Sequence, residues 1–129
     1  MTVVVGYLPN QYGKAALAEA ISEARLRGRR LVVVNATTGD ALVDTHYASE
    51  QGIAELEAEL SSLEEGHEVR QTLGPDIAEQ ILDVVREVDA SLLVIGLRHR
   101  SAVGKILMGS TAQRLLLDCP CPVLGVKAT

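Results

Sequence analysis

Five short runs of apolar, mostly β-branched residues punctuate the chain, and each predicts a β-strand. The runs cover residues 2–5, 30–35, 67–72, 91–95 and 122–126. Their starts lie roughly 24 to 37 residues apart, which leaves room for a helix between successive strands. This spacing is typical of βαβ units and predicts a parallel sheet. Three runs are apolar without alternation, which indicates strands covered on both faces.

The segments between these runs have the periodicity of amphipathic helices. Leu17, Ile21 and Ala24 form one apolar stripe. A second stripe consists of Ile53, Leu56, Leu60 and Leu63, and the glutamates around it are typical of a solvated helix face.

Residues typical of helix N-termini predict two further helices. The third begins at Gly74-Pro75-Asp76, where Asp76 and Glu79 have the spacing of a capping box. The fourth begins at Gly109-Ser110-Thr111, where Ser110 and Gln113 repeat that spacing. The pattern as a whole therefore predicts an α/β protein.

Composition narrows the possible functions. The 129 residues predict one domain, 1–129, and the absence of Phe and Trp predicts an aliphatic core. A net charge of −5, with 2% aromatic residues, argues against a nucleic-acid partner.

The first residues resemble neither a signal peptide nor a membrane span, so we expect a cytoplasmic protein without membrane association. Cys119 and Cys121 fit neither a redox Cys-x-x-Cys loop nor a zinc knuckle, which favours reduced thiols.

The loop after the fourth predicted strand carries most of the chemical information. In an open parallel sheet, ligands bind in loops at the carboxyl ends of the strands, here 6–13, 36–46 and 96–109. The last of these ends at a helix start and contains glycines at 96, 104 and 109, with cations at 98, 100 and 105. Backbone amides, a helix dipole and local positive charge together favour an anionic ligand such as phosphate.

Two common phosphate-binding motifs do not fit. A Walker A loop would need glycine at His99 and a hydroxyl residue at Ile106 around Gly104-Lys105. The dinucleotide fingerprint Gly-x-Gly-x-x-Gly is absent after the first strand, where the chain has Gly6-Tyr-Leu-Pro-Asn-Gln.

The order of elements, this glycine-rich loop and the ending Cys119-Pro-Cys-Pro-Val-Leu-Gly-Val-Lys together resemble the universal stress protein family. Many members bind ATP or AMP through a pattern of Gly, two residues, Gly, nine residues, Gly, then Ser or Thr. Gly96, Gly109 and Ser110 fit that frame, but His99 replaces the second glycine. ATP-binding members also usually carry an acidic residue after the first strand, where this chain has Leu8-Pro9-Asn10.

The resemblance implies a three-layer fold with a five-stranded open parallel sheet, in strand order 3-2-1-4-5. This is a flavodoxin-like or Rossmann-like arrangement of the adenine nucleotide alpha hydrolase type. It implies an adenine-nucleotide site, with ATP or AMP as ligand and magnesium undecided. The expected site residues come from three loops: Leu8, Pro9, Asn10, Ala36, Gly96, Arg98, His99, Arg100, Gly104, Gly109, Ser110 and Thr111. It also implies an antiparallel homodimer through the last strand, at Val123, Leu124, Gly125 and Val126.

Three functions follow from these observations. The first is a non-enzymatic stress-response protein that senses adenylate state by binding a nucleotide. The second is a dimeric interaction protein of the same fold whose pocket stays empty, because His99 and Leu8 depart from the binding pattern. The third is a weak ATP hydrolase, although no catalytic triad or metal-ligand spacing supports one, and Asp40 and Asp44 are the only carboxylate pair on the candidate loops. We therefore predict neither catalysis nor a metal site.

Overall fold

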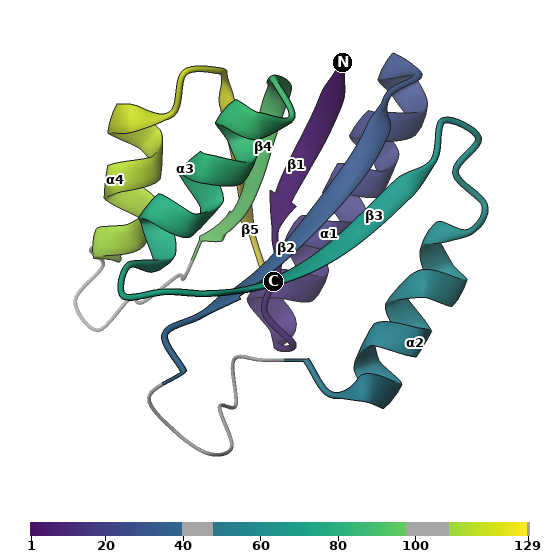
Figure 1. The fold of residues 1–129 in the computed structure, drawn as a ribbon. Coiled ribbons are helices and arrows are strands. Elements are labelled where there is room, and N and C mark those ends of the chain that lie inside the picture. Colours follow the sequence, from purple (N-terminus) through teal and green to yellow (C-terminus); the bar gives the residue numbers. More distant parts are fainter. Residues whose placement is uncertain (40–47, 98–108, 129) are drawn as a thin grey trace.

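Strands and helices alternate along the whole chain in the computed structural model (Figure 1), which describes residues 1–39, 48–97 and 109–128. The strands are β1 (Thr2–Gly6), β2 (Arg30–Thr37), β3 (His67–Leu73), β4 (Ala90–Leu97) and β5 (Val123–Lys127). The helices are α1 (Gln11–Arg27), α2 (Glu50–Leu60), α3 (Ile77–Glu87) and α4 (Ser110–Asp118).

The five strands form one parallel sheet in the order β3-β2-β1-β4-β5, so the predicted order is confirmed. In the middle of the sheet, Val4 of β1 pairs with Val32 of β2 and with Leu93 of β4. Because every strand is parallel, all the carboxyl ends meet at one edge of the sheet. β3 and β5 form its two lateral edges.

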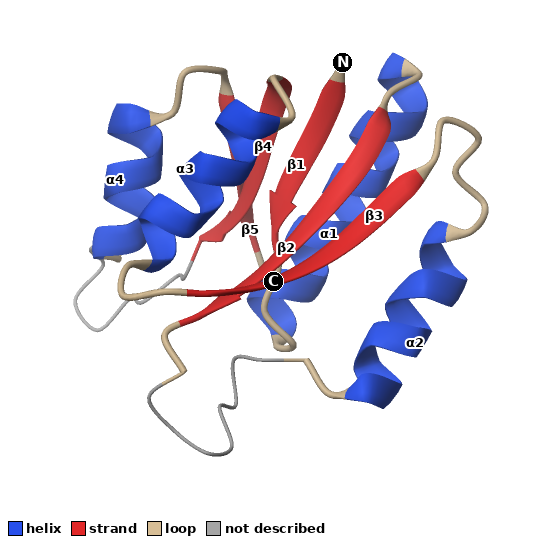
Figure 2. Cartoon of the chain, in the orientation of Figure 1, coloured by secondary structure: helices blue, strands red, loops and turns tan. Residues whose placement is uncertain are grey.

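Helices cover both faces of the sheet, which gives three layers (Figure 2). Alternate residues of β1 point to opposite faces: Val3 and Val5 pack in one core with α1 and α2, whereas Val4 packs in the other with α3 and α4. All three side chains are fully buried. The unbroken apolar runs of the inner strands therefore reflect burial on two sides, as the sequence predicts.

Side-chain caps start three of the four helices. Asn10 Oδ1 accepts hydrogen bonds from Tyr12 N and Gly13 N at the start of α1, and Asp76 accepts one from Glu79 N at the start of α3. The prediction of a Ser110 cap on α4 is wrong. Gly109 is the cap residue, and Ser110 is the first residue inside the helix.

Several boundaries differ from the predicted ones. β2 continues through Thr37, so Ala36 lies in a strand and not at the start of a loop. α2 ends at Leu60, and Leu63 is buried beyond that end because the turn after the helix folds it back onto the core. β4 extends through Leu97, where its last residues pair with β5.

Candidate functional site

A cavity of about 410 Å³ lies at the carboxyl edge of the sheet. Its wall is built from the ends of β1, β2 and β4 together with the first turns of α1, α3 and α4. The lining residues are Gly6, Tyr7, Leu8, Tyr12, Gly13, Val34, Ala36, Thr37, Thr38, Ile77, Ile81, Ile95, Gly96, Gly109, Ser110, Thr111, Ala112 and Leu115. The volume lies within the range of about 300 to 1,000 Å³ that small-molecule sites usually have.

The fold brings half of the expected site residues to this one cavity. Leu8, Ala36, Gly96, Gly109, Ser110 and Thr111 all line it, although they come from segments far apart in the sequence. Pro9 is exposed and does not line the cavity, and Asn10 serves as the cap of α1. Arg98, His99, Arg100 and Gly104 lie outside the described residues.

The first turn of α4 lines the cavity, and in the described part of the chain no side chain caps its amide groups. Gly109, the cap residue, has an extended backbone (φ −65°, ψ 157°) and no side chain that could accept from those amides. Among the described residues, no atom lies within 4 Å of a methyl group added at Gly109. Free N–H groups and the positive end of the helix dipole make this position suited to an anion.

Two other glycines of the wall allow close backbone packing. A Cβ at Gly96 would lie 2.5 Å from the carbonyl oxygen of Tyr12, and a Cβ at Gly13 would lie 1.8 Å from that of Leu8. Both distances are far shorter than a carbon can approach an oxygen without displacement. Gly96 therefore lets α1 pack onto the end of β4, a structural reason that the motif alone does not reveal.

A buried amide organises the end of β2 beside the cavity. Asn35 is fully buried, and its Nδ2 donates to the carbonyl oxygen of Tyr7 at 3.0 Å. Its Oδ1 accepts from Ala48 N at 2.7 Å and from Gln71 Nε2 at 3.2 Å. Asn35 thus joins β1, β3 and the segment before α2 directly next to Ala36.

Gln80 of α3 performs a similar task on the other face of the sheet. Its Nε2 donates to the carbonyl oxygens of Thr37 and Gly74, each at 3.0 Å, and its Oε1 accepts from the Thr72 hydroxyl at 2.6 Å. These bonds hold the start of α3 against the ends of β2 and β3. The hydrogen bond from Gln80 therefore fixes the position of Thr37 in the cavity wall.

Ion pairs connect the two helices that begin at the cavity. Arg114 of α4 donates to Asp76 and, at 2.5 Å, to Glu79 of α3. The Glu79 amide and then the Arg114 guanidinium lower the pKa of Asp76 below its ordinary value. The carboxylate remains charged at neutral pH and holds α3 and α4 side by side.

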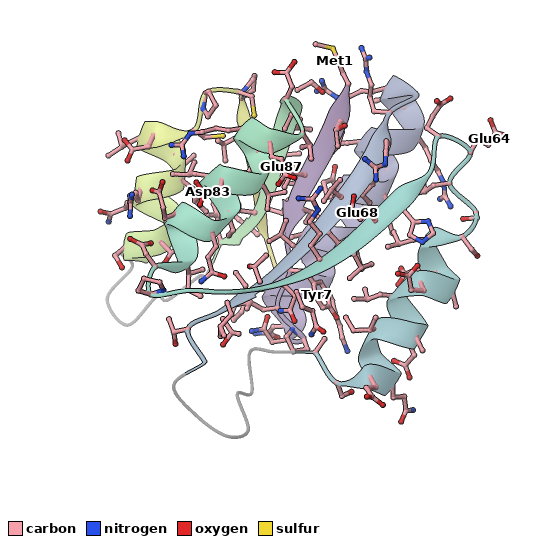
Figure 3. All side chains as sticks on the ribbon, in the orientation of Figure 1. Met1, Tyr7, Glu64, Glu68, Asp83 and Glu87 are labelled. Carbon is pink, nitrogen blue, oxygen red and sulfur yellow. The ribbon has the colours of Figure 1, made fainter. Side chains whose placement is uncertain are left out.

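Tyr7, labelled in Figure 3, follows directly on β1 and borders the cavity, and its side chain packs in the core with α1 and α2. Burial raises the pKa of this phenol, and the charges of Glu59 and Glu55 on α2 raise it further. The hydroxyl group is consequently neutral at physiological pH.

The described residues contain no group of three or more His, Cys, Asp or Glu side chains that could hold a metal ion. Within the same residues, no helix is long and apolar enough to cross a membrane.

Sequence reasoning missed part of the cavity wall. Thr37 and Thr38 lie in the candidate ligand loop 36–46 that the sequence predicts after the second strand, but neither is among the expected site residues. Ile77 and Ile81 form a helical stripe that is equally typical of a core. Their helical spacing predicts only that one face is apolar. The packing of α3 against the strand ends decides that part of that face borders a cavity.

Comparison with known proteins identifies the family. The model of the universal stress protein family matches residues 1–127. The chain belongs to this family. A universal stress protein of Mycolicibacterium smegmatis is 49% identical over 125 residues, which cover 97% of this chain and 96% of the relative.

Solved structures of universal stress proteins share the fold. One from Archaeoglobus fulgidus superposes with a TM-score of 0.73 at 30% identity, over 98% of both chains. Another structure, of the universal stress protein from Archaeoglobus fulgidus in complex with dAMP, superposes with a TM-score of 0.67 at 27% identity, again over 98% of both chains. These relatives confirm both the family and the predicted fold class.

Proposed function

We propose that this universal stress protein is a non-enzymatic sensor that binds an adenine nucleotide, ATP or AMP, in the cavity at the carboxyl edge of its sheet. The observation that carries the proposal is the open, uncapped start of α4 at Gly109, which faces the cavity together with Ser110 and Thr111. The amides and hydroxyls of that turn would receive phosphate oxygens.

The rest of the wall suits a base and a sugar. Val34, Ala36, Ile77, Ile81 and Ile95 offer apolar surface for a planar ring, and Thr37 and Thr38 add polar groups at its margin. Such a mixture of apolar lining and few polar groups is typical of small-molecule sites. The dAMP complex of the Archaeoglobus fulgidus relative supports an adenine nucleotide as the ligand.

Calorimetric titration with ATP, ADP and AMP, with and without magnesium, tests this function. We expect saturable binding that Gly109→Val and Ser110→Ala each weaken by about tenfold or more, because each removes access or one charge-assisted hydrogen bond. No atom of residues 1–39, 48–97 or 109–128 lies within 4 Å of a Cβ added at Gly109, so the substitution creates no clash with these parts of the fold. Leu117→Ala is the matched control, since Leu117 lies on α4 but is 84% exposed and does not line the cavity.

A lack of heat and of thermal shift at millimolar nucleotide would refute the sensor. That result would favour the second function, a protein of the same fold that acts by binding partners. The same titration therefore separates the two functions.

We further propose that the protein forms a homodimer through β5. This strand is at an edge of the sheet, its residues Val123, Leu124, Gly125 and Val126 are half-buried, and no described strand pairs with its outer side. An apolar edge strand of this kind is satisfied by antiparallel pairing with its own copy.

Sedimentation analysis tests the dimer. We expect the wild type to have a dimer mass and Leu124→Lys to be a monomer, because the substitution places a charge in the paired strand. Leu73→Lys, on the opposite edge strand, is the control and should leave the dimer intact. A monomeric wild type, or a Leu124→Lys variant of dimer mass, would contradict this interface.

A further inference from the structure

Two thiols lie within contact distance at the junction of α4 and β5. Cys119 is the cap residue directly after α4, and Cys121 lies two residues before β5 begins. Their Sγ atoms are 3.5 Å apart, and both residues are partly exposed. The sequence contains no other cysteine, so any internal thiol chemistry of this chain involves this pair.

The backbone on both sides of the pair is anchored. Cys119 N donates to the carbonyl oxygen of Leu115 at 3.0 Å, which ties it to the last turn of α4. The carbonyl oxygen of Pro122 accepts from Leu93 N at 3.0 Å, which ties the other side to β4. The Cys119 backbone is extended (φ −67°, ψ 130°) and is followed by the rigid ring of Pro120. The two thiols are therefore held as neighbours in the folded protein.

The two sulfur atoms are close enough for a disulfide to form after a short approach. They would have to approach by roughly 1.5 Å to reach the bonded distance of about 2.05 Å. Disulfides span Cα separations of about 4.4 to 6.8 Å, and the Cα atoms of residues i and i+2 are at most about 7.6 Å apart. Formation of the bond therefore requires the chain at Pro120 to be less than fully extended.

A metal site is the weaker explanation for the pair. In the ranges 1–39, 48–97 and 109–128, no third His, Cys, Asp or Glu joins the two thiols in a group that could hold a metal ion. Structural zinc needs four such ligands. Two adjacent thiols with anchored flanks are instead suited to two-electron oxidation.

We propose that Cys119 and Cys121 form a reversible thiol–disulfide site whose oxidant is a small hydroperoxide. This site is separate from the cavity and does not depend on nucleotide binding. It would make the protein respond to oxidants through the α4–β5 junction.

The chemistry proceeds in two steps. Burial, and then the neighbouring Cys119, raise the pKa of Cys121 to about 12, so the Cys121 thiol stays protonated at neutral pH. Cys119 Sγ loses its proton to water and attacks one peroxide oxygen; the O–O bond breaks, hydroxide leaves and takes up that proton, and Cys119 becomes a sulfenic acid. Cys121 Sγ then attacks Cys119 Sγ, the S–O bond breaks, and the Cys121 proton leaves with the hydroxyl as water. Overall, two thiols and one hydroperoxide give one disulfide and two waters when the oxidant is hydrogen peroxide.

Intact-mass measurement after treatment with hydrogen peroxide tests the proposal on the full chain. We expect one product, lighter than the reduced protein by two hydrogen atoms, with both thiols lost to titration and both restored by dithiothreitol. Addition of oxygen atoms to the wild type without that mass loss would overturn the proposal. So would a product in which two chains are joined by a disulfide on a non-reducing gel.

Two single variants separate the roles of the thiols. Cys121→Ser should stop at a sulfenic acid on Cys119 that a dimedone probe captures, because the resolving thiol is missing. Cys119→Ser should react with peroxide at least about tenfold more slowly than the wild type, because burial still raises the pKa of the remaining Cys121 thiol. Equal rates of reaction of the two variants with peroxide would refute the assignment of Cys119 as the attacking thiol. If a variant fails to fold, the mass measurement on the wild type still tests whether the disulfide forms.

Discussion

Gly13 and Gly52 occupy the same position relative to the N-terminal caps of their helices. Substituting each by alanine therefore tests whether the backbone packs closely at the cavity. Each is the third residue after a cap, Asn10 for α1 and Ser49 for α2. Each N–H donates to the side-chain oxygen of that cap, at 3.0 Å and 3.1 Å respectively. Helix propensity alone therefore predicts that alanine stabilises both positions by up to about 1 kcal/mol.

Their surroundings differ completely. A Cβ at Gly52 would make ordinary contacts, 3.4 Å from Ser49 Oγ and 3.6 Å from the Ala48 Cβ. A Cβ at Gly13 would lie 1.8 Å from the carbonyl oxygen and 2.4 Å from the nitrogen of Leu8, and neither backbone atom is at the end of a flexible side chain. Either the start of α1 or the segment after β1 must shift by about 1.5 Å, since unstrained carbon–oxygen contacts are near 3.3 Å. Overpacking of this kind costs about 1 to 3 kcal/mol or more.

We therefore expect Gly52→Ala to raise the free energy of unfolding slightly and Gly13→Ala to lower it by about 2 kcal/mol or more. Urea unfolding followed by circular dichroism, at a fixed protein concentration, measures both. If Gly13→Ala were as stable as Gly52→Ala, α1 would not contact the Leu8 backbone as described. The packing argument for the cavity wall would then fail.

Two further substitutions test the polar contacts around the sheet. Glu68 on β3, labelled with Glu87 of α3 in Figure 3, accepts from Arg70 and from Arg30, and these bonds lower its pKa, Arg70 most. Because the folded pKa is lowered, the stabilisation is present above the unfolded pKa of about 4.3 and is lost as the pH falls through the folded value. In urea unfolding, the wild type should therefore exceed Glu68→Gln in free energy of unfolding by less at pH 3 than at pH 7. A difference in free energy that does not change with pH would contradict this role of the Glu68 carboxylate. Asn35→Ala should lower the free energy of unfolding by about 2 to 3 kcal/mol, because it leaves the buried Ala48 N–H without its acceptor. A change on the order of 0.5 kcal/mol in urea unfolding would mean that another group satisfies that amide.

The fold was accessible to sequence reasoning because its signals are local. A βαβ chain alternates apolar runs with helical stripes, and such periodicity depends only on neighbouring residues. Asp76 caps α3 where the spacing predicts a cap. The cap of α4 was misplaced by one residue, because Ser110 fits the capping pattern while the backbone places Gly109 at that position.

The candidate site was accessible only in part. Gly96, Gly109 and Ser110 stand out because they form a spaced motif after a strand. The contribution of Ile77 and Ile81 to the cavity is invisible in the chain, since an apolar helical stripe has the same pattern against a core or a cavity. The need for glycine at Gly96 likewise depends on Tyr12, a residue of a distant helix.

The sequence by itself determined the alternation of elements, the parallel sheet, the aliphatic core and the family, because each follows from residue type and spacing along the chain. Only the tertiary structure decided which residues share the cavity and that Asn35 and Gln80 support its wall. The physical reason is that these properties depend on distances between segments, and those distances exist only after the helices pack on the sheet.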